Sequence, residues 1–288
     1  METKLIDGKQ IARDVRAELK EKVKKAVSAG MKAPKLVVIL VGEDPASKIY
    51  VNNKEKACGW VSMKSETLRM PAETSEEEVL AKISELNADP EVNGILVQLP
   101  LPKGLDEQKI LLAIDPAKDV DGFHPMNVGK SAVGDASALV SCTPLGIMEL
   151  LHRSGIQVSG KRCVVAGRSN IVGKPMARLL LADNGTVTVC HSRTQDMDQI
   201  LKEADIFVAA VGKPKMFRGE QLKDGAVVID VGIHHLDDGI CGDVDTESCM
   251  GKVSYITPVP GGVGPMTIAM LLSNTWQAYC TQNNYKAD

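Results

Sequence analysis

Aromatic side chains are scarce in this chain, since Phe, Trp and Tyr together make up 3% of its 288 residues. Proteins that bind single-stranded nucleic acids use exposed aromatic rings as stacking platforms. An excess of positive charge is also missing, because 34 Lys and Arg are balanced by 37 Asp and Glu. Without a basic surface, the chain has no electrostatic footprint for nucleic acid or for an anionic membrane. We therefore predict neither as a partner.

Long hydrophobic runs are absent as well. No stretch approaches the roughly 20 apolar residues of a membrane-spanning helix, and the first twenty residues mix acids and bases without the apolar core of a signal peptide. The seven cysteines are an odd number and include no C-x-x-C pair. This pattern is typical of reduced thiols rather than of disulfides or zinc ligands. We expect a soluble, cytoplasmic protein.

Apolar strands and amphipathic helices alternate along the chain, whose length is enough for about two domains. In the first half, the runs 36–41 and 94–99 predict buried strands. The second half alternates more regularly, with strands expected at 162–166, 186–190, 206–211 and 226–231. This order is typical of an α/β fold whose second half is a doubly wound, Rossmann-like parallel sheet. A small, polar linker at 130–141 and a helix start at Thr143-Pro144 place the domain boundary near Thr143.

One pair of side chains stands out in the first half. Tyr50 and Lys54 lie four residues apart in a segment, 46–58, that contains no Gly or Pro. This spacing predicts that both side chains leave the same face of a helix. A lysine whose surroundings lower its pKa can move protons near neutral pH. On spacing alone, an ordinary pair on a surface helix fits as well.

Two further polar residues have a functional and a structural interpretation. Gln98 is an amide close to the carboxyl end of an apolar strand, the edge at which ligands bind in α/β sheets. The alternative is a buried amide bonded to neighbouring backbone. Asp121 lies in the turn-forming sequence DVDG, where it is either a turn residue or a carboxylate that binds the N–H groups of a heterocycle. Spacing does not decide between these interpretations.

The turn after the first strand of the second half lacks the G-x-G-x-x-G pattern of many dinucleotide sites. Its glycines, Gly167 and Gly173, are six residues apart but still lead into a helix start, which can bind phosphate. A tight structural turn is the alternative. The next strand ends without the acidic residue that binds the ribose of NAD. Arg168, Ser192 and Arg193 favour a 2′-phosphate instead, so we predict NADP as the cofactor.

Two motifs remain near the end of the chain. The adjacent His234 and His235 would point to opposite faces of a strand, and neither Cys nor acid completes a ligand set, so we predict no metal site. The segment 257–267 contains three Pro and three Gly. Such a segment has a rigid path with exposed backbone N–H groups, which favours a ligand-facing loop before a final helix at about 266–279.

Taken together, the motifs carry a family resemblance. They are YVNNKEKACG, GILVQLPLP, DVDGFHPMNVG, CTPLGIMELL, AGRSNIVGKPMARLLL, VIDVGI, GDVD and TPVPGGVGPMT. In this order they resemble the bifunctional methylenetetrahydrofolate dehydrogenase/methenyltetrahydrofolate cyclohydrolase family over nearly the whole chain. The resemblance implies NADP-dependent oxidation of 5,10-methylenetetrahydrofolate and hydrolysis of the methenyl product to 10-formyltetrahydrofolate, in one-carbon metabolism. It also implies a homodimer.

The resemblance further implies a domain plan and a set of site residues. A folate-binding domain would span 1–142, an NADP-binding Rossmann domain 143–265, and a helix at 266–288 would pack back on the first domain, with the active-site cleft between the domains. Lys54 resembles the catalytic lysine, Tyr50 its partner against the folate, Gln98 the amide that tunes the lysine, and Asp121 the carboxylate that holds the pterin. The implied folate-binding residues are Tyr50, Val51, Asn52, Asn53, Lys54, Val97, Gln98, Leu99, Asp121, Pro260, Gly261, Gly262, Val263 and Gly264. The implied cofactor-binding residues are Gly167, Arg168, Ser169, Gly173, Ser192, Arg193 and Ile233.

Other functions explain less of the sequence. A short-chain dehydrogenase also uses Tyr-x-x-x-Lys, but after its nucleotide loop, whereas Lys54 precedes Gly167 by more than 100 residues. An enzyme like shikimate or amino-acid dehydrogenases would share the two-domain plan without explaining VQLPLP or PGGVGP. A regulator that binds NADP without catalysis would be expected to have lost its lysine site, whose residues are all intact. A family member with only one of the two activities remains an alternative.

Overall fold

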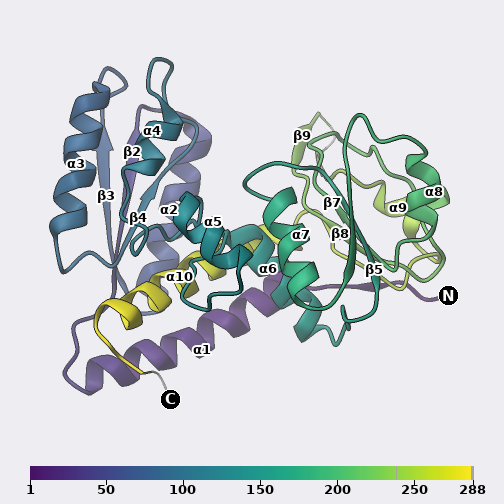
Figure 1. Ribbon diagram of the computed structural model, residues 1–288, viewed down its shortest axis with the longest axis horizontal. Coiled ribbons are helices and arrows are strands. Elements are labelled where there is room, and N and C mark those ends of the chain that lie inside the picture. The colour runs from purple at the N-terminus through teal and green to yellow at the C-terminus, as the bar shows by residue number, and fades with distance from the viewer. Residues whose placement is uncertain (238, 287–288) are drawn as a thin grey trace. The chain divides into compact units, whose positions relative to one another are not determined.

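The computed structural model describes residues 1–237 and 239–286, and the chain forms two compact units (Figure 1). The three-stranded unit comprises residues 14–142 and 268–286, and the six-stranded unit comprises residues 1–13 and 143–267. The chain passes from one unit to the other within three helices. These are α1 (Gly8–Ser28), α6 (Cys142–Arg153) and α10 (Val263–Gln282).

The three-stranded unit is built on a parallel sheet with the strand order β3-β2-β4. Its strands are β2 (Lys35–Val41), β3 (Lys64–Met70) and β4 (Gly94–Val97). The central strand β2 is almost entirely buried, because side chains cover both of its faces. The helix α3 (Glu76–Ala88) covers the sheet with Val79, Ile83 and Leu86, whose spacing is that of one helical face.

Side-chain caps define where the helices of this unit begin. The helix α2 (Pro45–Trp60) starts at a proline, and the Asp44 carboxylate accepts a hydrogen bond of 2.7 Å from the backbone N–H of Ser47. Ser75 and Glu78 form a reciprocal capping box at the start of α3. Two shorter helices follow β4. They are α4 (Glu107–Leu112) and α5 (Pro125–Ala132).

The six-stranded unit is a fully parallel sheet with the order β1-β11-β8-β7-β5-β6. Its strands are β1 (Lys4–Leu5), β5 (Arg162–Ala166), β6 (Thr186–Cys190), β7 (Ile206–Ala209), β8 (Val227–Asp230) and β11 (Tyr255–Ile256). Its helices are α7 (Gly173–Ala182), α8 (Met197–Lys202) and α9 (Thr246–Cys249), with a 3₁₀ turn at Gly219–Gln221. A separate antiparallel hairpin pairs β9 (His234–Leu236) with β10 (Gly239–Cys241). One face of the sheet packs on a core that includes the edge-to-face rings of Phe207 and Phe217.

The predicted α/β fold class, with a doubly wound parallel sheet in the second half, is confirmed. The linker expected at 130–141 is wrong in its first residues, because α5 continues to Ala132. His124 caps this helix by accepting a hydrogen bond of 3.1 Å from the N–H of Met126, and Pro125 occupies its first turn. Among the described residues, no helix is both long and apolar enough to cross a membrane.

Candidate active site

Three of the predicted catalytic residues meet in the three-stranded unit. Lys54 lies on α2, Gln98 directly follows β4, and Asp121 lies in the loop before α5. The Lys54 Nζ donates a hydrogen bond of 2.9 Å to Oε1 of Gln98. The Gln98 Nε2 donates one of 2.7 Å to the carbonyl oxygen of Leu99, which orients the amide with its oxygen toward the lysine.

The sheet brings these segments together. The backbone N–H of Gln98 donates to the carbonyl oxygen of Ile39 at 2.9 Å, so pairing with β2 continues past the end of β4. On the other side of β4, Asp119 forms a parallel bridge with Ile95. The loop that carries Asp121 therefore starts beside the strand that carries Gln98, at the carboxyl edge where ligands bind in parallel sheets.

Burial shifts the protonation of both charged groups at this site. It lowers the pKa of the Lys54 ammonium, against the opposing attraction of the Asp121 carboxylate. It raises the pKa of Asp121 to about 6, again against the attraction of Lys54 and with the support of the negative charge of Asp119. Titratable groups whose pKa values are shifted in this way cluster at functional sites.

The loop around Asp121 is held by a residue that the sequence did not single out. The Asp119 carboxylate is buried and accepts hydrogen bonds from the N–H of His124 at 2.9 Å and from Nδ2 of Asn127 at 3.0 Å. Gly122 has φ +71°, and a Cβ there would lie 2.5 Å from the carbonyl carbon of Val140. Only glycine allows this close packing and this backbone conformation.

The other predicted residues on α2 and after β4 differ in exposure. Tyr50 exposes 49% of its surface, one turn before Lys54, and is available to a ligand. Val51 and Val97 are buried in the core of the unit, so their side chains pack inside it and hold the segments that carry Lys54 and Gln98. Asn52 is exposed and accepts a hydrogen bond of 3.3 Å from Arg69. Asn53 is exposed as well.

The predicted cofactor loop lies in the six-stranded unit, between β5 and α7. Gly167 has φ +123°, and a Cβ there would lie 2.1 Å from the carbonyl oxygen of Ala210. A Cβ on Gly173 would lie 2.2 Å from the carbonyl oxygen of Gly167. The Ser169 hydroxyl accepts hydrogen bonds from the N–H groups of Val172 at 3.2 Å and Gly173 at 3.3 Å. The loop therefore folds tightly onto the start of α7, which explains both glycines.

Three exposed polar residues flank this loop. Arg168 follows β5, and Ser192 and Arg193 follow β6, its neighbour in the sheet. The carboxyl ends of parallel neighbours lie at one edge, so the arginines share the edge that carries the glycine loop. The turn after β6 is fixed by a hydrogen bond of 3.2 Å from the N–H of Arg193 to Nδ1 of His191.

Two buried aspartates organise the same edge beyond β7 and β8. The Asp243 carboxylate accepts hydrogen bonds of 2.6–3.0 Å from the consecutive N–H groups of 211–213. It also pairs with Nε2 of His234 at 2.8 Å. The Asp230 carboxylate accepts from the N–H groups of Gly232, Asp243 and Val244 at 2.8–3.0 Å, and burial raises its pKa to about 6.

Neither aspartate was identified as a site residue from the sequence. Their only signal was that they fall within the motifs VIDVGI and GDVD. His234 is paired with Asp243, and no cluster of three or more His, Cys, Asp or Glu suited to a metal ion occurs in residues 1–237 and 239–286.

The Pro- and Gly-rich loop belongs to the six-stranded unit together with Ile233. A Cβ on Gly264 would lie 3.6 Å from Cδ1 of Ile233, so the two residues are neighbours. A Cβ on Gly8 would lie 1.8 Å from the carbonyl oxygen of Gly262, because the start of α1 packs directly on the loop. The structure thus groups Lys54 with Gln98 and Asp121 in one unit, and groups the cofactor residues with 260–264 in the other.

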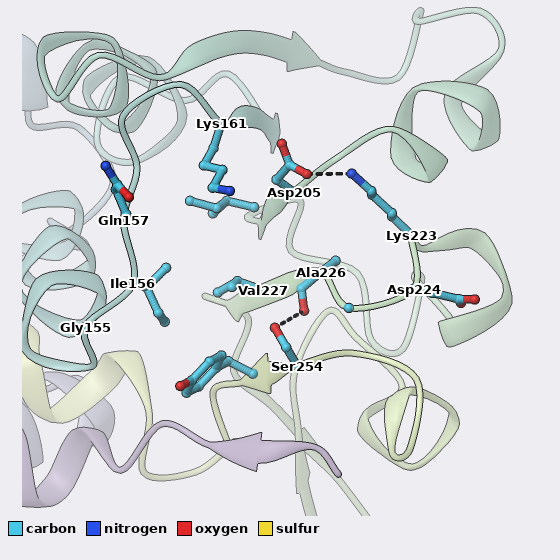
Figure 2. Close-up of a pocket in the computed structure, with 13 residues that line it drawn as sticks. Gly155, Ile156, Gln157, Lys161, Asp205, Lys223, Asp224, Ala226, Val227 and Ser254 are labelled. Atoms are coloured by element: carbon cyan, nitrogen blue, oxygen red, sulfur yellow. Dashed lines mark hydrogen bonds and ion pairs between the residues drawn. The ribbon is translucent and has the colours of Figure 1, made fainter. Parts of the chain in front are cut away.

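A surface pocket of about 360 Å³ lies at the opposite, amino edge of the six-stranded sheet (Figure 2). It is lined by residues at the starts of β5, β7, β8 and β11, and Lys223 forms an ion pair of 2.6 Å with Asp205 there. None of the predicted site residues lines it. Since ligands of parallel sheets bind at the carboxyl edge, this pocket is separate from the candidate site.

Comparison with known proteins covers nearly the whole chain. Residues 6–121 match the family model "Tetrahydrofolate dehydrogenase/cyclohydrolase, catalytic domain", and residues 141–283 match "Tetrahydrofolate dehydrogenase/cyclohydrolase, NAD(P)-binding domain". The bifunctional protein FolD of Desulfovibrio desulfuricans is 58% identical over 279 residues, which are 96% of this chain and 98% of that protein.

Two solved structures are similar throughout. The bifunctional methylenetetrahydrofolate dehydrogenase/cyclohydrolase FolD of Campylobacter jejuni has a TM-score of 0.94 and 48% identity, and covers 97% of this chain and 99% of its own. The Trypanosoma brucei methylenetetrahydrofolate dehydrogenase-cyclohydrolase, solved with NADP and an inhibitor, has a TM-score of 0.92 and 38% identity, with 98% of each chain covered.

Proposed function

The chain belongs to the tetrahydrofolate dehydrogenase/cyclohydrolase family, and we propose that Lys54 is its key catalytic residue. It is an enzyme of folate metabolism with NADP as its cofactor. The proposed reactions are the oxidation of 5,10-methylenetetrahydrofolate to 5,10-methenyltetrahydrofolate and the hydrolysis of that product to 10-formyltetrahydrofolate. We assign folate binding to the domain 1–142 with the C-terminal segment 266–288, whose last two residues lie outside the described part of the chain, NADP binding to the domain 143–265, and both steps to one cleft between them.

The residues at the carboxyl edge of the six-stranded sheet fit NADP. Gly167 and Gly173 let the turn fold tightly onto the start of α7, and a helix start attracts phosphate. Arg168 and Arg193 are exposed, and within the described residues neither forms an ion pair, so both are available to a 2′-phosphate. When bound, NADP would supply the acceptor for the hydride of the methylene carbon. The protein would contribute mainly by positioning the two rings, and Ile233 is assigned to the nicotinamide end of the cofactor site.

The hydrolytic step needs a group that accepts a proton from water. Burial lowers the pKa of Lys54, which increases the fraction of neutral amine near neutral pH. The oxygen of a water molecule bonds to the methenyl carbon while its proton passes to the neutral Lys54 amine. The bond from that carbon to N5 of the folate then breaks, N5 takes the proton from the Lys54 ammonium, and the hydroxyl of the adduct loses its proton as the formyl group forms on N10, so that one proton is released overall. Gln98 holds the amine at 2.9 Å.

Asp121 is assigned to the recognition of the pterin ring. With a pKa of about 6, the carboxylate is mainly ionised at neutral pH and can accept two parallel hydrogen bonds from an amidine-like edge. Its charge also attracts the Lys54 ammonium, so the occupancy of Asp121 by substrate is expected to favour the neutral amine. Tyr50, which is half exposed on the same helix face as Lys54, is assigned to contact the folate.

The observation that carries the proposal is the hydrogen bond between Lys54 and Gln98 near the partly buried carboxylate of Asp121. Replacement of the amine by an isosteric apolar chain tests it. We expect Lys54→Met to abolish hydrolysis of added methenyltetrahydrofolate while the Kd for NADP stays near that of the wild type. Lys56→Met is the matched control, because Lys56 is an exposed lysine of the same helix. A Lys54→Met protein that hydrolyses at the wild-type rate would overturn the assignment.

We also propose that the enzyme works as a homodimer in the cytoplasm. All seven cysteines are unpaired, which suits a reducing compartment. Sedimentation of the purified protein, with a mass of twice 30.9 kDa expected, and fractionation of the source cells test these two points separately.

A further inference from the structure

We propose that Asn274, on the C-terminal helix α10, is a positioning residue for Asp121. This inference rests on the proposed function, since the binding of folate by Asp121 is part of it. Asn274 lies far from Asp121 in sequence and outside every motif considered for the site, and it is 1% exposed. Buried side-chain amides need hydrogen-bond partners, and the partners of Asn274 all belong to the backbone and side chains around Asp121.

The contacts of Asn274 join two irregular segments. Its Nδ2 donates a hydrogen bond of 2.8 Å to the carbonyl oxygen of Val120, the residue before Asp121. The same atom donates one of 2.8 Å to the carbonyl oxygen of Val140. An amide nitrogen has two hydrogens, so each hydrogen serves one carbonyl. Asn274 therefore fixes the spacing between the Asp121 loop and the segment that leads into α6.

The loop is also held from the side of α6. The Cys142 thiol donates to the carbonyl oxygen of Val120 at 3.4 Å and lies 3.9 Å from Oδ1 of Asp121. Asn274 approaches the same sulfur at 3.6 Å. Gly122, on the other side of Asp121, packs against the backbone of Val140. The peptide that carries the Asp121 carboxylate is thus clamped at both ends, and Asn274 contacts both parts of the clamp.

Removal of the amide should loosen this clamp without removing a group that touches substrate. The Val120 carbonyl would lose a donor in a buried place and the Val140 carbonyl would lose one in a partly buried place, which favours movement of the loop toward water. Displacement of a substrate-binding group by about 1 Å can lower a rate about 100-fold. We expect Asn274→Ala to raise the KM for methylenetetrahydrofolate roughly tenfold or more and to leave the Kd for NADP unchanged.

Gln277 supplies the matched control. It lies on the same helix, and its Nε2 also donates to two carbonyl oxygens, those of Ala136 at 3.2 Å and Ala138 at 3.1 Å. Gln277→Ala therefore removes the same kind of contact from the same helix but leaves Val120 untouched. A purely structural role for Asn274 predicts that both variants lose stability and keep the KM for folate. A positioning role predicts a raised KM in Asn274→Ala alone.

The experiment compares Asn274→Ala, Gln277→Ala and Asp121→Asn by KM and kcat for both reactions, by Kd for NADP and by thermal unfolding. If Asn274→Ala fails to fold, Asn274→Ser, which keeps one hydroxyl donor, replaces it with a smaller rise in KM expected. Equal folate KM values in the Asn274 variant and Gln277→Ala, with a raised KM in Asp121→Asn, would overturn the positioning role alone. An unchanged KM in Asp121→Asn would overturn the proposed role of Asp121 itself, whatever the Asn274 variant does.

Discussion

A methyl group added to Gly173 should separate the two activities of the enzyme. Gly173 opens α7, and its Cβ would lie 2.2 Å from the carbonyl oxygen of Gly167 and 2.8 Å from Cα of Arg168. Non-bonded heavy atoms are at their best separation near 3.5 Å, so the loop and the helix start must move apart by about 1 Å. Both atoms belong to backbone, so no side chain can rotate away to make room.

This displacement would affect the loop between β5 and α7, which is proposed to bind the NADP phosphates. Misplacement by about 1 Å can cost about 100-fold where positioning matters, so we expect Gly173→Ala to bind NADP roughly 100-fold more weakly. Dehydrogenase activity should fall with it, at subsaturating NADP. Hydrolysis of added methenyltetrahydrofolate requires no NADP, so its rate should stay near that of the wild type. Overpacking should also lower the free energy of unfolding by about 1–3 kcal/mol.

The assay is a fluorescence titration of NADP into each variant, with the hydrolysis of methenyltetrahydrofolate followed in parallel. Gly129→Ala is the control, because Gly129 lies within α5 and no atom would lie within 4 Å of its Cβ. Alanine at a helical site without such contacts stabilises by about 0.5–1 kcal/mol. Wild-type affinity for NADP in Gly173→Ala would refute the assignment of this loop to the cofactor.

Three further predictions concern single side chains. The pKa of Asp121 is raised from 3.8 to about 6, so the free energy of unfolding falls as the pH rises through this range. Calorimetry should therefore find Asp121→Asn more stable than the wild type near pH 8, and this difference should disappear near pH 4. Asp243→Asn removes the carboxylate that accepts three loop N–H groups and His234, and should lower the free energy of unfolding in urea by about 2 kcal/mol or more, whereas the exposed Asp224→Asn should change it little. Arg193→Ala should raise the KM for NADP and leave the KM for NAD unchanged, as steady-state kinetics with both cofactors would test.

Local patterns predicted β2, β4, β5, β6, β7 and β8 but missed β3. This strand alternates charged and polar residues, as in Lys64, Glu66 and Arg69, and it lies at the edge of its sheet. Edge strands need only one partner and can expose both polar faces, so they lack the apolar run that identified the buried β2. The strands β1 and β11 are two residues long and pair with each other across the length of the chain, which no local pattern could indicate.

The candidate site was predictable where a residue type is unusual in its position. Gln98 was identified because an amide interrupts an apolar strand, and the structure places its oxygen on Lys54. Spacing alone could not have paired them, because the pairing depends on how α2 packs on the sheet beside β2 and β3. The family resemblance supplied the pairing. Asp119 and Asn274 were not predicted as site residues, because they act through hydrogen bonds to backbone groups of other residues. These partners can be identified only in the folded chain.

The most direct test of the central claim follows absorbance while the purified protein acts on 5,10-methylenetetrahydrofolate with NADP in one cuvette and NAD in another. The account predicts that NADPH forms with little accumulation of methenyltetrahydrofolate, because one enzyme carries out both steps, and that NADP is preferred to NAD. Methenyltetrahydrofolate that builds up and decays no faster than in buffer would contradict the account, since the enzyme would then be a dehydrogenase alone and Lys54 would have no hydrolytic role.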